Sequence, residues 1–218
     1  QGDYVALFYD NDNKRFLKWD EATGAGNCQL IDDPTTKLFS FQTGMDIIDM
    51  KNTKFSGGVV YSILQNAGGE RYVYGINLSG GAFEQTIGKQ IKSQGFNTAT
   101  QFAFHSQYPY MFYDNGEKVV SYQLMTDAVS EPLTLPGEEI TLLKFNTFMR
   151  PESSLSDKSE KFLEQQYYLI VGSYKKGDTT GKGGKLRFYK FDQASGSLTL
   201  MKEYDGFGKI KDVTYRER

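Results

Sequence analysis

A strand–turn–strand pattern occurs near both ends of the chain and limits the folds that the chain can adopt. Residues 185–200 read KLRFYKFDQASGSLTL, and residues 15–30 read RFLKWDEATGAGNCQL. In each segment alternating apolar and polar residues lead to an aromatic–Asp pair, and a turn containing Ala and Gly follows. Alternation with a period of two is typical of half-buried strands, and glycine suits the turn between them. Two distant copies of one hairpin predict a repeat protein built from β-strands.

The composition also favours an all-β fold. The chain of 218 residues contains 15 Tyr, 16 Phe and 23 Gly but only 5 Pro. Aromatic and β-branched side chains suit the pleated surface of a sheet, and glycines suit its tight turns. A chain of this length can bury a substantial core within one domain. We therefore expect a single all-β domain over residues 1–218.

Turn signals divide the chain into four repeats of about four short strands. We expect repeats at 45–91, 98–136 and 139–207, and a first repeat at 1–37 that is completed by a C-terminal strand at 209–216. Repeats of about 40–45 residues with four antiparallel strands are typical of β-propeller blades. Completion of one blade by both chain ends removes an exposed sheet edge. We predict a β-propeller-like fold of about four blades; the alternatives are the C-terminal part of a larger propeller, a β-sandwich and an irregular β-domain.

Charge and hydropathy exclude two classes of partner. The formal net charge is −2, and the 25 basic and 27 acidic residues are interspersed. No basic stripe follows a phosphate backbone, so we expect no nucleic-acid partner. No apolar run approaches the roughly 20 residues that span a membrane, and no signal-peptide pattern is present. Because the sequence begins at Gln1 rather than Met, we expect a mature product or an excised domain.

Four features that could suggest metal, phosphate or nucleophilic chemistry are weak. The Asp-Asn-Asp-Asn run at 10–13 resembles the start of a calcium loop but lacks its Gly and distal Glu, and we interpret it as a hairpin turn. The segment 177–183 lacks the spacing and the hydroxyl residue of a phosphate loop, so we expect a flexible loop there. His105 is the only histidine and Cys28 the only cysteine, which excludes a multi-histidine zinc site and an internal disulfide. We predict no metal and no cofactor.

Acidic residues provide the least weak indication of catalysis. Asp46 and Asp212 lie on strands that we expect to be the innermost strands of their blades. Glycosidases use a pair of carboxylates about 5–10 Å apart across a shared cleft. A glycoside hydrolase or lyase that uses Asp46 and Asp212 is therefore the alternative function, although solvated structural aspartates are the simpler interpretation.

Aromatic residues in loops are candidate contacts for a glycan or peptide ligand. Trp19, Tyr108 and Tyr110 lie next to predicted turns or strand ends. Aromatic rings can pack on sugar rings, but at alternating strand positions they more often form the core between sheets. We name these three residues as candidate ligand contacts.

Two insertions extend the last repeat and are candidate partner-binding surfaces. Residues 150–165 are polar, and residues 175–184 are rich in Gly, Lys and Thr. Insertions in repeat proteins often gather on a binding face. Within the second insertion the candidate contacts are Lys175, Lys176, Asp178 and Lys182; ordinary surface loops are the alternative.

The C-terminal sequence resembles a known family. The segment GFGKIKDVTYRER at 206–218, which follows KLRFYKFDQASGSLTLMKEYD, is similar to the C-terminus of PKD-like surface lipoproteins of Bacteroidetes. Their genes lie beside those of SusC/SusD-type outer-membrane nutrient importers. The resemblance extends over about the last 40 residues and brings no catalytic motif.

This resemblance implies a location and a role. It implies an extracytoplasmic protein at the outer-membrane surface, held there by a lipid anchor. It also implies a non-catalytic binding or scaffolding module that serves a SusC/SusD-type importer of glycans or peptides. Together with the lack of a convincing catalytic set, it leads us to expect that the chain is not an enzyme.

Overall fold

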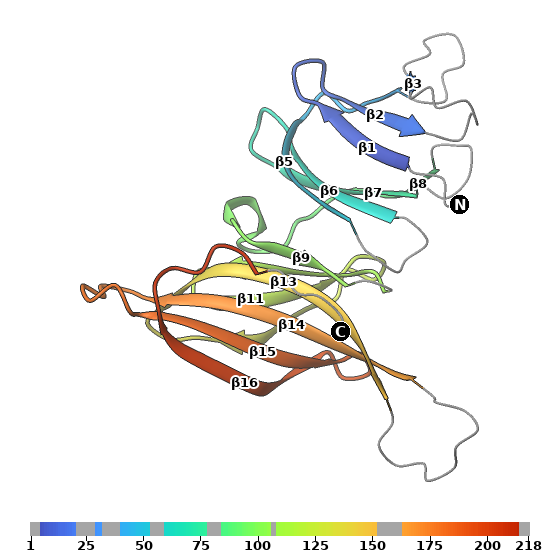
Figure 1. Ribbon diagram of the computed structural model, residues 1–218. Helices are drawn as coiled ribbons and strands as arrows, with labels where there is room; N and C mark the ends of the chain where they lie inside the picture. Colours follow the sequence, from blue (N-terminus) through green and yellow to red (C-terminus); the bar gives the residue numbers. More distant parts are fainter. Residues whose placement is uncertain are drawn as a thin grey trace, which may run out of the picture. The chain divides into compact units, whose positions relative to one another are not determined.

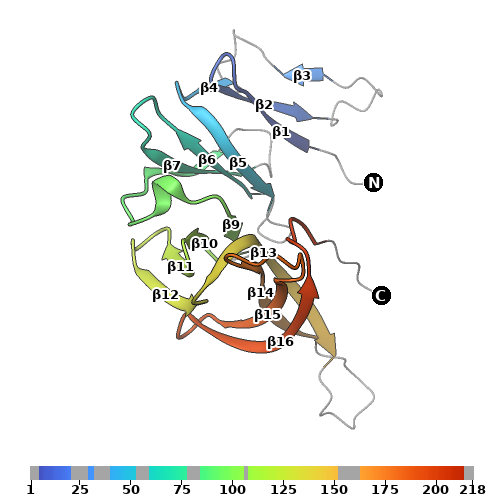
Figure 2. The same ribbon diagram turned by 90° about the vertical axis from the view of Figure 1, so that its left-hand side faces the viewer.

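A computed structural model describes residues 5–20, 29–31, 40–52, 59–77, 84–105, 108–151 and 163–213 (Figures 1 and 2). The chain divides into two compact units, Gln1–Lys92 (unit 1) and Ser93–Arg218 (unit 2). The described residues form four antiparallel sheets of four strands each and one short 3-10 helix. The all-β prediction is confirmed at this level.

The first sheet of unit 1 is built on the hairpin that the repeat pattern predicts. Its strands are β1 (Val5–Asp10), β2 (Arg15–Asp20), β3 (Gln29–Ile31) and β4 (Ser40–Gln42). β1 pairs with β2, while β3 and β4 both pair with β2, along different stretches of it. In the turn after β1 the Asp10 carboxylate accepts bonds from the Asn13 backbone and side chain and from Arg15. The interpretation of 10–13 as a hairpin turn is therefore confirmed.

The second sheet of unit 1 has the strand order β5-β6-β7-β8. Its strands are β5 (Asp46–Asn52), β6 (Val59–Gln65), β7 (Arg71–Asn77) and β8 (Glu84–Gln90). Phe16 of the first sheet packs with Met45, Leu64 and Ile76 in one buried cluster. Unit 1 therefore has a core of its own, to which both of its sheets contribute.

Unit 2 begins with a sheet of short strands in the order β12-β11-β10-β9. They are β9 (Phe102–Phe104), β10 (Tyr110–Asn115), β11 (Lys118–Gln123) and β12 (Val129–Thr134), and the helix η1 (Phe96–Thr98) precedes them. The β10–β11 turn has Gly116 and Glu117 at its centre, directly after Asn115, and Gly116 has a φ of 66°. That left-handed conformation costs glycine little, so this hairpin is well defined by the local sequence.

The last sheet consists of four long strands in the order β13-β14-β15-β16. They are β13 (Glu138–Pro151), β14 (Leu163–Lys175), β15 (Gly184–Asp192) and β16 (Ser197–Phe207). The insertion predicted at 150–165 extends the β13–β14 hairpin, since Pro151 still pairs with Leu163. Residues 152–162 lie outside the described residues, and residues 163–165, the end of a stretch at 159–165 with a weak helical tendency in its sequence, belong to β14 instead.

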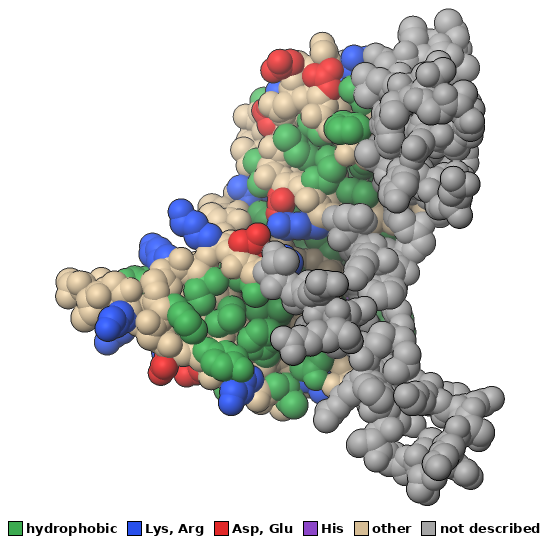
Figure 3. Space-filling model, viewed as in Figure 1, with side chains coloured by type: hydrophobic (Ala, Val, Ile, Leu, Met, Phe, Trp, Pro, Cys, Tyr) green, Lys and Arg blue, Asp and Glu red, His purple; other side chains and the backbone are tan. Residues whose placement is uncertain are grey.

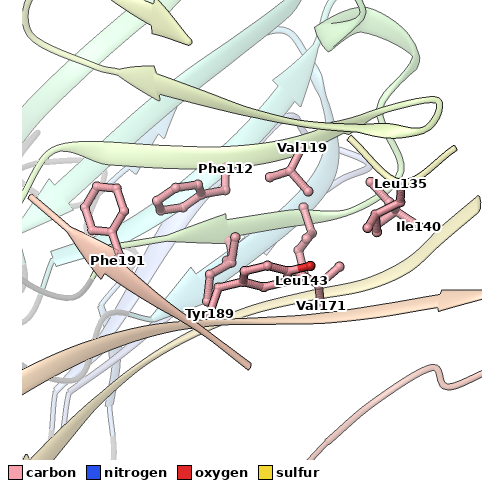
Figure 4. Packing of buried hydrophobic residues seen from close by; sticks show 10 residues of the cluster. Phe112, Val119, Leu135, Ile140, Leu143, Val171, Tyr189 and Phe191 are labelled. Atoms are coloured by element: carbon pink, nitrogen blue, oxygen red, sulfur yellow. The ribbon is translucent and has the colours of Figure 1, made fainter. Parts of the chain in front are cut away.

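The core of unit 2 lies between its two sheets. Figure 4 shows Phe112 and Val119 facing residues such as Leu143, Val171 and Tyr189 of the last sheet. Burial of an aliphatic or aromatic side chain of this size contributes about 1.5–3 kcal/mol. The alternation of β15 places Arg187, Tyr189 and Phe191 on its buried face, and Tyr189 and Phe191 belong to this core.

The C-terminal segment differs from the prediction. A strand was expected at 209–216, but residues 209–213 form no strand, and 214–216 lie outside the described residues. After β16 the chain turns back along β13 (Figure 1), where Lys209 pairs with Glu139 and Lys144 pairs with Asp212. Ile210 lies beside Gly172 of β14. The segment therefore stays against the β13–β16 sheet.

The strand units agree with the predicted repeats, and the propeller arrangement stays a prediction. The second, third and fourth sheets coincide with the repeats at 45–91, 98–136 and 139–207 within a few residues. β4 was not anticipated. Among the described residues no helix has the length and apolar character needed to cross a membrane.

Candidate ligand-binding cleft

The ends of the four strands of the last sheet meet at one place and leave a cleft there. Pairing brings Glu138 of β13 opposite Lys175 of β14, and Gly184 of β15 lies between Tyr174 of β14 and Phe207 of β16. The cleft has a volume of about 620 Å³. Its lining is made by turns and strand ends: Pro136, Gly137, Glu138, Lys175, Asp178, Lys182, Gly183, Lys185, Asp205 and Gly206.

Asp178 holds the β14–β15 loop in shape along one side of the cleft. Its carboxylate accepts hydrogen bonds from the Tyr174 hydroxyl at 2.8 Å, the Thr180 hydroxyl at 2.9 Å and the Gly183 amide at 3.2 Å. These bonds, that from Tyr174 first, lower the pKa of Asp178 to about 2. The flexible loop expected at 177–183 is thus a hydrogen-bonded hairpin loop built around one carboxylate.

A buried arginine, Arg187, bonds to Glu138 of the cleft lining. The side chain of Arg187 is 6% exposed and donates two hydrogen bonds to Glu138, at 2.7 and 3.0 Å. It also bonds to Ser173 at 2.8 Å and to Glu203 at 2.5 Å. The hydrogen bond from Arg187 is the main cause that lowers the pKa of Glu138 to about 2. This network ties β13, β14, β15 and β16 together where the strands end, which gives the cleft a fixed floor.

Three charged groups in the cleft are left for a ligand. The ammonium nitrogen of Lys185 lies 3.7 Å from a carboxylate oxygen of Glu138 and 3.6 Å from one of Glu203. Lys185 therefore forms ion pairs with both carboxylates of the Arg187 network. Lys175, Lys182 and Asp205 are exposed, and within the described ranges none of them forms an ion pair. The cleft therefore presents two ammonium groups and one carboxylate to solvent.

The cleft is suited to recognition more than to proton transfer. Its two internally bonded carboxylates, Glu138 and Asp178, both have a pKa of about 2 and are ionised at neutral pH. A general acid needs a pKa near the working pH. In the part of the chain that the structure describes, no group of three or more His, Cys, Asp or Glu side chains is arranged to hold a metal ion.

Three of the four predicted partner contacts line the cleft. Lys175, Asp178 and Lys182 do so, whereas Lys176 donates to Glu117 at 2.8 Å on the β10–β11 hairpin. Lys176 therefore helps to fix the loop to the neighbouring sheet. The role of these residues in binding a partner stays a prediction.

The two predicted catalytic carboxylates are not brought together within either unit. Asp46 belongs to unit 1, where its carboxylate bonds to Lys14, and this bond is the main cause that lowers the pKa of Asp46. Asp212 belongs to unit 2, is 75% exposed and lies 3.3 Å from Lys144. A lowered pKa makes Asp46 a poor general acid, and both residues act as partners of lysines.

The aromatic candidates occupy different environments. Tyr110 packs against the unit 2 core, with its ring 5.6 Å from that of Phe191. Tyr108 is 36% exposed and packs edge-on against His105, with the ring centroids 5.0 Å apart. Trp19 lies in β2, and its side chain lies outside the described part. Neither tyrosine is among the described residues that line the cleft.

The lone histidine is a core residue. His105 is 1% exposed, and its ring lies 4.4 Å from Phe145 and 4.5 Å from Tyr167. Burial lowers its pKa to about 3, so it is neutral at physiological pH. His105 therefore has a structural place in the core of unit 2 and not on its surface. Cys28 lies outside the described residues.

Sequence reasoning missed Glu138, Arg187, Lys185 and Asp205. One feature of the sequence could have indicated Arg187 and its need for a partner such as Glu138. Arg187 interrupts the apolar face of β15, and a charge on a core-facing position needs a buried partner. Comparison with known protein families and with curated proteins gave no match to this chain.

Proposed function

We propose that this protein is a non-catalytic recognition module that binds its ligand in the cleft at the end of the last sheet. The observation that carries the proposal is that some charged groups of the cleft are bonded within the protein, whereas others are exposed to solvent. Glu138 is bonded to Arg187, and Asp178 is bonded to donors of its own loop, so these groups form a fixed frame. Lys175, Lys182 and Asp205 stay exposed on that frame. Rigid scaffolds with charged loops at one end are suited to binding.

The cellular setting that we propose rests on the C-terminal resemblance. Residues 206–218 resemble the end of Bacteroidetes surface lipoproteins whose genes accompany SusC/SusD-type importers. On this basis the module acts outside the cell at the outer membrane. There it delivers a glycan or peptide to the importer or helps to hold the importer complex together.

A pull-down tests this role. The tagged full chain is incubated with solubilised outer membranes of a Bacteroidetes species, and the recovered proteins are identified by mass spectrometry. We expect a SusC/SusD-type importer to co-purify, and Lys182→Glu in the cleft to reduce its recovery. Lys211→Glu, an exposed charge reversal outside the cleft, is the matched control. Recovery of the tagged chain alone contradicts the proposal.

The propeller arrangement and the glycosidase alternative stay hypotheses. The alternative requires a hydrolytic activity on a glycan that both Asp46→Asn and Asp212→Asn abolish. A hydrolytic activity that survives both substitutions removes these residues from any catalytic role.

A further inference from the structure

The ligand of the cleft can be inferred from those charged groups of its lining that are exposed to solvent. Glu138 receives two bonds from Arg187 and one from Ser173. Asp178 receives three bonds within its own loop. Both carboxylates are half-buried and held by these donors, so Asp205 is the exposed carboxylate of the cleft. This inference rests on the proposed recognition role of the cleft and names the class of its ligand.

The free charges are of both signs and come from different elements. Lys175 and Lys182 belong to the β14–β15 hairpin, and Asp205 belongs to the end of β16. A ligand with negative charge alone would meet Asp205, and a cation alone would meet the two lysines. Like charges brought together in this way cost binding energy. A ligand that carries one carboxylate and one ammonium group satisfies both ends.

The rest of the lining argues against stacking of a sugar. Among the described residues no aromatic ring lines the cleft, although aromatic side chains supply most of the packing area for flat apolar ring faces. Three glycines line it instead, and Gly137 and Gly206 have φ values of 77° and 80°. Glycine lets a ligand approach the main chain closely, so backbone amides and carbonyls are within reach of a peptide. A volume of about 620 Å³ lies within the range of about 300–1,000 Å³ that is typical of small-ligand pockets.

We infer that the cleft binds a zwitterionic ligand of the amino-acid and short-peptide class. Its carboxylate lies between Lys175 and Lys182, and its ammonium group pairs with Asp205. Charge-assisted hydrogen bonds of this kind are about twice as strong as neutral ones, and they fix the direction of the ligand in the cleft.

Titration of the full chain with trialanine tests the inference. Binding is followed by isothermal calorimetry and by the amide NMR signals of Gly137, Gly183 and Gly206. N-acetyl-trialanine lacks the ammonium group, trialanine amide lacks the carboxylate, and free alanine separates amino-acid from peptide binding. We expect trialanine to shift the three glycine signals and each blocked peptide to bind at least about tenfold more weakly.

Substitutions in the cleft test which residue binds each charged end of the ligand. Lys182→Met weakens trialanine binding about tenfold and makes it insensitive to amidation. Asp205→Asn weakens it similarly and makes it insensitive to acetylation. Lys211→Met and Asp12→Asn are matched controls outside the cleft, and we expect them to bind trialanine like the wild type.

Two outcomes overturn the inference: no shift of the glycine signals at saturating trialanine, or equal binding of trialanine and its blocked forms. The pull-down is independent of this titration. Importer recovery without trialanine binding removes the zwitterion inference and leaves the proposed function. Trialanine binding without importer recovery keeps the cleft as a binding site and removes the proposed importer setting.

Discussion

Arg187 is the residue on which the end of the last sheet most depends. Its guanidinium group is almost fully buried and bonds to Glu138 and Glu203 from two different strands. A buried ion pair adds little net stability compared with apolar residues, but removal of one partner leaves the other charge uncompensated. Arg187 therefore acts mainly by fixing how β13, β15 and β16 end.

We expect Arg187→Met to lower the free energy of unfolding by about 2–4 kcal/mol. Methionine keeps most of the length of the side chain but leaves Glu138 without its main partner. Urea unfolding with an unchanged m-value measures the loss. Lys118→Met is the control, because its pair with Glu131 is exposed and contributes about 0–1 kcal/mol. An Arg187→Met midpoint equal to that of the wild type contradicts the structural role.

Acid tests the same network through Glu138. Because its folded-state pKa, about 2, is below the ordinary value of 4.5, its contribution to stability is full above pH 4.5 and is lost as the pH falls towards 2. We expect the wild type to be more stable than Glu138→Gln at pH 6 and the difference to shrink at pH 3. Urea midpoints at pH 6, 4 and 3 measure this difference. A difference independent of pH would contradict the ionised, Arg187-bound state of Glu138.

At the scale of elements, the close approach of the chain after β16 to the start of β15 requires glycine at position 184. A Cβ atom at Gly184 would lie 2.0 Å from the carbonyl oxygen of Gly208. The chain after β16 therefore passes directly over the start of β15. The same β16 is an edge strand among the described elements, and Figure 3 shows hydrophobic side chains gathered over β14–β16.

We expect Gly184→Ala to destabilise the protein by about 1–3 kcal/mol, because backbone must move to admit the methyl group. It should also weaken ligand binding, since Gly184 lies next to the lining of the cleft. Thermal unfolding and the trialanine titration measure the two effects. Gly208→Ala is the matched control: its Cβ would meet its nearest neighbour at 3.7 Å, an ordinary contact. Equal stability of the two variants would refute this close approach.

At the scale of the whole molecule, each unit has its own buried cluster. Unit 2 has one that includes Phe112, Leu169 and Phe191. We expect residues 93–218, produced alone, to unfold cooperatively and to keep the trialanine affinity of the full chain. Circular dichroism during heating and calorimetry measure this. Loss of cooperative unfolding in the fragment would mean that unit 2 depends on unit 1.

The sequence by itself determined the elements of this protein. Alternation over β15, the Asn-Gly of the β10–β11 turn and the Gly-rich loops are local signals, because side-chain direction and turn conformation depend on near neighbours. They located nearly all the strands and their grouping into four sets. The short β4 (Ser40–Gln42) was not anticipated.

Only the tertiary structure decided where the charges meet. Glu138, Arg187 and Asp205 are far apart in sequence, and the register of four strands brings them to one end of a sheet. The segment at 209–213 shows the same limit: a strand was expected there, but the segment forms no strand and lies along β13, where Lys209 pairs with Glu139 and Asp212 with Lys144. Periodicity reports which face a residue takes, whereas pairing partners depend on long-range contacts that no local pattern encodes.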